Sequence, residues 1–161
     1  MDHTDIGNTL HTRCEFYRRV CDLPAVVDPP QLQRISMRAG RIWALMMPSP
    51  LGAAVRIRMD RQGSQIGPIL SHPRSNHWSF LIVPDLPFDA SLFASLFSRE
   101  VSVVRDGGTI ALPSPSDSCS VFREWIELPS GPFRPSGRVV VDAIEACTSP
   151  LRKPIRKISH V

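Results

Sequence analysis

Long apolar runs are missing from this sequence of 161 residues. No run approaches the roughly 18 apolar residues that a membrane span requires. Residues 1–10 are polar and lack the apolar core of a signal peptide. We therefore expect a cytoplasmic protein with no membrane partner. With 42% hydrophobic and 21% charged residues, the chain can bury a core, which excludes a disordered tail, and its length suits one domain of ordinary size.

The four cysteines include no pair with CxxC spacing. A close cysteine pair is what makes a zinc motif convincing. His11, Cys14 and Cys21 share one face of a predicted helix, so a metal site can be imagined there. Without such a pair, we interpret these cysteines as reduced, partly buried thiols, and we predict no metal and no cofactor.

Acidic residues are missing from residues 148–161, which contain Arg152, Lys153, Arg156 and Lys157. Without these four cations the chain has 15 basic and 15 acidic residues, so the whole net charge of +4 lies in this basic tail. Two interpretations stay open. The tail is either a solvated terminus, which we favour, or an arm that contacts the phosphates of a nucleic acid.

Hydrophobic periodicity predicts one helix and a proline-rich loop within residues 1–39, an α+β domain over residues 40–147, and the tail over residues 148–161. The predicted elements, in chain order, are a helix over 13–23, a strand over 42–47, a helix over 50–62, strands over 67–71 and 77–83, a helix over 89–97, strands over 100–105, 109–112 and 122–128, and a helix over 138–147.

The order of the elements between residues 42 and 104 is strand, helix, strand, strand, helix, strand. This order is typical of an RRM-like or ferredoxin-like fold, an antiparallel sheet with both helices on one face. Asp106-Gly107-Gly108 predicts a tight turn that adds a hairpin strand, residues 122–128 an edge strand, and residues 138–147 a C-terminal helix. The other face of the sheet is left open, and we expect function there.

Two segments carry a resemblance to a known family. Residues 101–115 (VSVVRDGGTIALPSP) and His77-Trp78-Ser79-Phe80 resemble parts of the bifunctional DNA primase/polymerases, the prim–pol branch of archaeo-eukaryotic primases. That family has a strand ending in Asp-x-Asp, then His-x-x-Phe, and later an Asp strand that runs into a Gly-Gly hairpin. The resemblance covers residues 40–146. The chain also looks like short bacterial proteins labelled RNA polymerase beta subunit, although no beta-subunit motif is present.

The carboxylates of the resembled family are absent. Met46 and Met47 stand where the first pair would lie, and Ser102 stands in place of the later Asp. Phosphoryl transfer in that family resembles two-metal chemistry, in which carboxylates hold divalent cations. A thioether and a hydroxyl do not replace such ligands. The resemblance therefore implies a degenerate, non-catalytic relative.

His77 is the position that this chain retains, and the resemblance implies that it contacts the triphosphate of a nucleotide. Arg74 and Arg105 lie in predicted loops near the same rim, and together they could hold a phosphate. The alternative for all three is an ordinary surface position, where arginine and histidine are common.

Strand parity decides which side chains reach the open face, because neighbours on a strand point to opposite faces. If His77 faces the open side, Met46, Ser79, Ser102 and Val104 share that face. Trp43, Trp78 and Phe80 then face the helices. In the alternative parity these three aromatics form a base-stacking platform like that of RNA-recognition modules.

We therefore expect a non-catalytic binding module derived from a prim–pol fold. It binds nucleic acid or a protein partner of the replication or transcription machinery, or it associates with itself. The rather apolar open face favours a protein partner or self-association. The alternative is a nucleotide-binding or nucleotide-hydrolysing enzyme of unknown type that uses His77 and Arg105.

Overall fold

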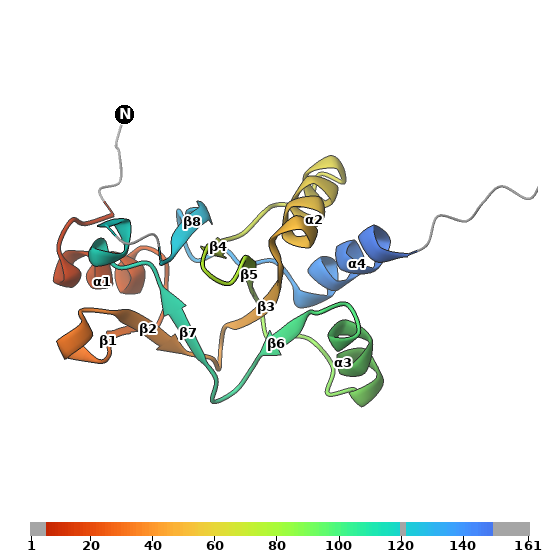
Figure 1. The fold of residues 1–161 in the computed structure, drawn as a ribbon, viewed down its shortest axis with the longest axis horizontal. Coiled ribbons are helices and arrows are strands. Elements are labelled where there is room, and N and C mark those ends of the chain that lie inside the picture. The colour runs from red at the N-terminus through yellow and green to blue at the C-terminus, as the bar shows by residue number, and fades with distance from the viewer. Residues whose placement is uncertain (1–5, 120–121, 150–161) are drawn as a thin grey trace, which may run out of the picture.

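The computed structural model describes residues 6–119 and 122–149, and Figure 1 shows their arrangement. Within this part of the chain, no helix is long and apolar enough to cross a membrane. The helices are α1 (Leu10–Arg19), α2 (Ser49–Arg61), α3 (Ala90–Phe97) and α4 (Gly137–Thr148), with short 3-10 turns over Pro30–Leu32 and Pro115–Cys119. The strands are β1 (Ala25–Val27), β2 (Ile35–Arg38), β3 (Trp43–Pro48), β4 (Ile69–His72), β5 (His77–Ile82), β6 (Ser102–Val104), β7 (Thr109–Leu112) and β8 (Glu124–Glu127).

A five-stranded antiparallel sheet forms the centre of the molecule, with the strand order β6-β3-β5-β4-β8. Its first four strands have the order that the split βαβ arrangement requires. The predicted α+β class, the antiparallel sheet and the C-terminal helix are therefore confirmed. The continuous apolar run becomes the inner strand β3, and the predicted edge strand becomes β8 at one edge.

A second, three-stranded sheet has the order β1-β2-β7 and was not predicted. Its strands β1 and β2 lie in the segment where proline spacing predicted a loop. Both are only three or four residues long, and three consecutive residues of β2 are buried, so neither shows the alternation that marks a strand. Residues 6–39 thus pack on the domain.

The predicted hairpin between β6 and β7 is wrong. Gly107 has a φ of +87°, and the Gly108 N–H donates to the Arg105 carbonyl at 2.8 Å, so the tight turn is present. Beyond the turn, however, β7 pairs with β2 in the three-stranded sheet, while β6 pairs with β3. The turn carries the chain from one sheet to the other.

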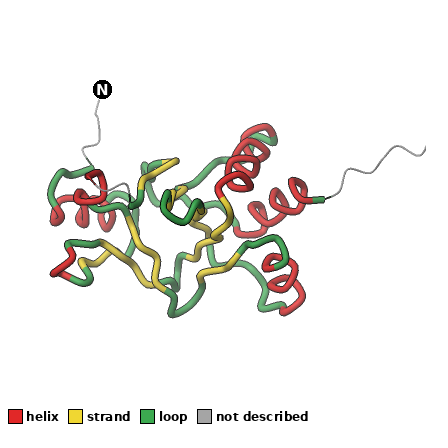
Figure 2. Tube along the Cα trace, in the orientation of Figure 1, coloured by secondary structure: helices red, strands yellow, loops and turns green. Residues whose placement is uncertain are grey.

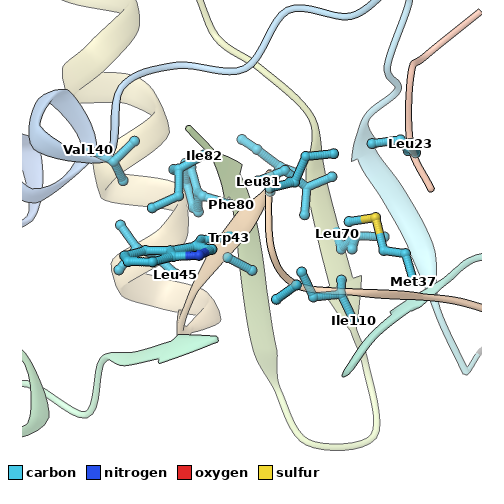
Figure 3. Packing of buried hydrophobic residues seen from close by; sticks show 14 of the residues in the cluster. Leu23, Met37, Trp43, Leu45, Leu70, Phe80, Leu81, Ile82, Ile110 and Val140 are labelled. Atoms are coloured by element: carbon cyan, nitrogen blue, oxygen red, sulfur yellow. The ribbon is translucent and has the colours of Figure 1, made fainter. Parts of the chain in front are cut away.

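The two faces of the five-stranded sheet are covered by different layers. Helices α2 and α4 pack on one face, and β1, β2, β7 and α1 lie on the other side (Figures 1 and 2). We call the face toward β7 the second face. Figure 3 shows Trp43 and Phe80 toward Val140 of α4, and Leu70 beside Met37 of the three-stranded sheet. All five residues belong to one buried cluster, so both layers share one core.

The predicted strand parity is confirmed. A Cβ atom added at Gly52 of α2 would lie 2.9 Å from the Trp78 ring, so Trp78 faces the helices. Trp43 and Phe80 are 7% and 1% exposed. The strand register places both on the same face of the sheet as Trp78. These three aromatics belong to the helix side of the sheet, and the alternative of a base-stacking platform is wrong.

The expectation of an open second face is only partly correct. Ala44, Leu70 and Leu81 lie on this face and are almost completely buried. Ile110 of β7 and Met37 of β2 cover this region (Figure 3). The physical reason is that the apolar side chains of this face need a partner layer, and the three-stranded sheet provides it.

Candidate functional site

The uncovered part of the second face lies beside a hollow of about 170 Å³, which we call the sheet hollow. Met46, Ser79 and Val104 line it from the five-stranded sheet, and Thr109 and Ala111 line it from β7. The four side chains predicted for the open face do lie on the second face, but Ser79 is only 4% exposed, whereas Ser102 is exposed. The predicted open surface is thus a narrow cleft between two sheets.

The register places the positions of the resembled family's acids side by side. Met46 of β3 pairs with Ser102 of β6 and with Ser79 of β5. These neighbours present a thioether and two hydroxyl groups to one another. Among residues 6–119 and 122–149, no group of three or more His, Cys, Asp or Glu side chains is placed to hold a metal ion.

The imagined site at His11, Cys14 and Cys21 does not assemble. The Cys14 thiol donates to the Ala25 carbonyl at 3.5 Å, and the Cys21 thiol donates to the Pro129 carbonyl at 3.6 Å. Burial raises the pKa of Cys14, and it raises the pKa of Cys21 to about 12. Both groups are therefore protonated thiols at neutral pH. The interpretation as free, buried thiols is confirmed for Cys14 and Cys21, whereas Cys147 is free but exposed.

Two histidines lie opposite each other beside the sheet hollow. His72 of β4 pairs with His77 of β5 across a tight turn. The His72 Nε2 atom lies 2.9 Å from the Ser79 hydroxyl. The His77 Nδ1 atom lies 2.6 Å from the Ser75 carbonyl. Since a carbonyl only accepts, Nδ1 of His77 donates, and its Nε2 atom is left for another partner.

The environment of His72 is positively charged. Burial lowers the pKa of His72 below its ordinary value, and the charges of Arg123 and His77 lower it further. A neighbouring carboxylate would have the opposite effect. His72 is therefore neutral at pH 7, because protonation would add one more positive charge to a partly buried cluster of basic groups.

Three arginines complete this cluster. Arg74, in the turn between the histidines, stacks on Phe122 with its Cζ atom 3.7 Å from the ring centroid, and the Arg34 Cζ atom lies 5.4 Å from the same centroid. Arg123 lines the sheet hollow, and its Nε atom is buried without a hydrogen-bond partner among the described residues. We call Arg34, His72, Arg74, His77 and Arg123 the basic cluster.

Among the described residues, no acidic side chain forms an ion pair with a member of the basic cluster. Within the described part of the chain, the ion pairs of arginine involve Arg19, Arg41, Arg56 and Arg134, and none includes a member of the cluster. Like charges held together without a counterion repel one another, and a buried N–H without an acceptor costs free energy. A bound anion would relieve the repulsion.

A second hollow, of about 330 Å³, is also lined by Arg123. It is less suited to an anion, because Asp117 and Glu124 line it together with Arg13. The buried Asp117 carboxylate accepts from the Ser114 backbone N–H at 2.8 Å. The chemistry of the two hollows therefore favours the sheet hollow as the anion site.

The structure brings together two of the three predicted phosphate ligands. His77 and Arg74 lie in the basic cluster, but Arg105 does not. Arg105 follows Val104, which pairs near the beginning of β3, whereas His77 pairs with the last residue of β3. Arg105 stacks on Phe88 and Phe93 near α3. The predicted basic tail, Arg152, Lys153, Arg156 and Lys157, lies outside the described residues.

Sequence reasoning missed Arg34, His72 and Arg123. His72 could have been found, since His72 and His77 are placed symmetrically about the turn at residues 73–76 and such a hairpin makes them face each other. Arg123 precedes the edge strand β8, and its position depends on the pairing of β8 with β4, which no local pattern indicates.

Comparisons of the chain with protein-family models, with curated proteins and with solved structures found no match.

Proposed function

We propose that this protein is a non-catalytic nucleic-acid-binding module in which the basic cluster holds the phosphates of a single strand. The observation that carries the proposal is the basic cluster, in which His72 and Arg123 line the sheet hollow and no member is ion-paired with an acid among the described residues. Arginine binds phosphate oxygens through parallel N–H groups, and histidine adds a further donor. The cluster has the charge and the donors that phosphates require.

The size of the sheet hollow favours a polymer over a free nucleotide. Sites for small ligands usually measure about 300–1,000 Å³, whereas the sheet hollow measures about 170 Å³. It has room for a single phosphate group at Arg123. Arg34 and Arg74 flank Phe122 outside the hollow, so they would bind further phosphates along the same chain.

A single strand fits this arrangement better than a duplex. Proteins that read a duplex usually insert a protruding helix or strand ribbon into its major groove. Two members of the basic cluster instead line a cleft between two sheets, and the others lie beside it. Single-stranded nucleic acids are commonly held in such positively charged grooves.

The resemblance to the prim–pol domains supports the same class of ligand. In that family the retained histidine position contacts a nucleotide triphosphate, and His77 belongs to the basic cluster. Met46 and Ser102 stand in place of acids, which supports binding without catalysis. We therefore propose a degenerate prim–pol relative that acts with the replication or transcription machinery.

The proposal is tested by the fluorescence anisotropy of labelled oligothymidylate at several salt concentrations. We expect affinity to fall with salt, with a slope of log K against log salt of about −2 for three arginine–phosphate contacts. Arg34→Ala and Arg74→Ala should each make the slope shallower by roughly 0.7. Arg61→Ala, at the exposed end of α2, is the matched control and should leave the slope unchanged.

Three other outcomes would contradict the proposal. The first is an absence of binding at low salt. The second is binding that is lost when Arg152, Lys153, Arg156 and Lys157 are replaced by alanine but not when the basic cluster is changed, which would make the tail the binding arm. The third is magnesium-dependent turnover of a nucleoside triphosphate, which would favour the alternative of an enzyme.

A further inference from the structure

The two edges of the five-stranded sheet differ in how they are protected. At one edge, β8 carries Glu124 and Glu127, and Arg56 of α2 forms an ion pair with Glu127. Charged side chains of this kind keep an edge strand from pairing with other chains. The opposite edge strand, β6, has the sequence Ser102-Val103-Val104 and carries no charge. Its outer side is unpaired in the described residues.

Large aromatic side chains lie exposed beside the β6 edge. Phe88 is 86% exposed and Phe97 is 79% exposed. Phe97 lines a hollow of about 160 Å³ together with Val103 of β6, and we call this the β6 hollow. Phe88 packs edge-to-face on Phe93, which also lines the hollow, with 6.0 Å between the ring centroids. This surface thus has both a protruding ring and a cavity.

The size of the β6 hollow suits an aromatic ring, because an apolar cavity of about 150 Å³ is enough to hold benzene. Its wall includes Arg105. The Arg105 guanidinium lies 4.6 Å from the Phe88 centroid and 4.4 Å from the Phe93 centroid. Its charge therefore already lies over aromatic rings and does not point out of the surface as a bare cation would.

We propose that two copies of this chain pair through β6 about a two-fold axis, with Phe88 of each copy in the β6 hollow of the other. A two-fold interface must be self-complementary, and a protruding ring beside a ring-sized hollow meets this requirement. Identical strands related by such an axis pair antiparallel, as all neighbours in this sheet do. The pairing forms one continuous sheet across both copies.

The exposed aromatic rings supply part of the area that this dimer would bury. A phenylalanine side chain buries about 150–250 Å², so Phe88 and Phe97 of two copies supply roughly 600 Å² at their observed exposure. Stable specific interfaces bury about 1,200–2,000 Å² in total. These rings supply about half of the lower value, and the β6 backbone and the rest of the hollow supply more. A dissociation constant of about 1–100 μM is expected.

The dimer does not depend on nucleic-acid binding, but it determines where the two basic clusters lie relative to each other. In a continuous sheet about a two-fold axis perpendicular to it, both second faces point to the same side. The two basic clusters would then lie on one side of the dimer.

Analytical ultracentrifugation of the full-length protein without nucleic acid tests the proposal. The average mass should rise from the 17.9 kDa of one chain toward twice that value as the concentration passes through the micromolar range. Phe88→Asp and Phe97→Asp should each keep the protein monomeric. Both side chains are exposed, so the fold should survive, and circular dichroism checks this. Leu128→Asp beside the β8 edge, with Leu128 47% exposed, is the matched control and should still dimerise.

A protein that stays monomeric up to the highest soluble concentration would overturn the proposal. A dimer that survives both phenylalanine substitutions, or one that is lost only with Leu128→Asp, would overturn it as well. If the protein stays monomeric, the β6 edge would be free for a strand from another protein. If only Leu128→Asp abolishes the dimer, the β8 edge would be the interface.

Discussion

Replacing Arg123 with glutamate should lower the affinity for oligothymidylate about 10–100-fold, because a hydrogen bond to a charged group contributes roughly 1.5–3 kcal/mol. Arg123 lies in the sheet hollow with an Nε–H group that has no acceptor among the described residues. A phosphate in the hollow would bind the Arg123 guanidinium. Arg123→Glu removes this contact and places a negative charge where the phosphate should bind.

The same substitution should change His72 in a way that simple unfolding would not. The charge of Arg123 lowers the pKa of His72, so a carboxylate at this position should raise that pKa. Loss of binding together with a raised pKa of His72, in a protein with normal circular dichroism, identifies a local electrostatic effect. Arg61→Glu serves as the charge-matched control. An unchanged affinity in Arg123→Glu would contradict the assignment of the sheet hollow.

Replacing Phe80 with alanine should lower the free energy of unfolding by about 3–5 kcal/mol, the cost typical of deleting a buried phenylalanine ring. Phe80 is 1% exposed and lies on the helix side of β5, opposite Leu45 of β3 and Ile69 of β4. The urea midpoint of unfolding measures the loss. Phe133→Ala is the matched control, because Phe133 is 40% exposed and should cost less than about 1 kcal/mol.

Phe80→Ala also distinguishes the two parities of the sheet. A core residue affects stability first, and under conditions where the variant stays folded its affinity for oligothymidylate should match that of the wild type. A base-stacking residue would lose about 1–3 kcal/mol of binding and little stability. A stable Phe80→Ala variant that no longer binds would mean that the aromatic side of the sheet is the interface.

Local signals in the sequence predicted most of the central domain. The continuous apolar run at residues 42–47 indicated a buried strand, and β3 covers Trp43–Pro48. The helix expected over residues 89–97 is α3, and the Asp89 side chain accepts from the Ser91 N–H at its start. The parity of β5 can also be inferred from the sequence, because large apolar residues on the helices need large partners on one face of the sheet.

Features that depend on distant pairing could not be predicted in this way. The tight turn at Gly107 was visible, but a turn does not state whether the strands on its two sides pair with each other. Here β7 pairs with β2, whose short buried run shows no alternation. Arg123 was missed for the same reason, because its position at the sheet hollow depends on the pairing of β8 with β4 and not on a local pattern.

The most direct test of the basic cluster is the titration of His72 by NMR, with and without saturating oligothymidylate. In the free protein its pKa should lie below the ordinary value of 6.5. As the pH falls below about 6.5, the unfolded chain takes up a proton that the folded chain resists, so the free energy of unfolding should also fall. A bound phosphate stabilises the imidazolium form. The account therefore predicts that nucleic acid raises the pKa of His72 and binds more tightly at lower pH. A pKa of His72 that does not move when nucleic acid is bound would contradict the account.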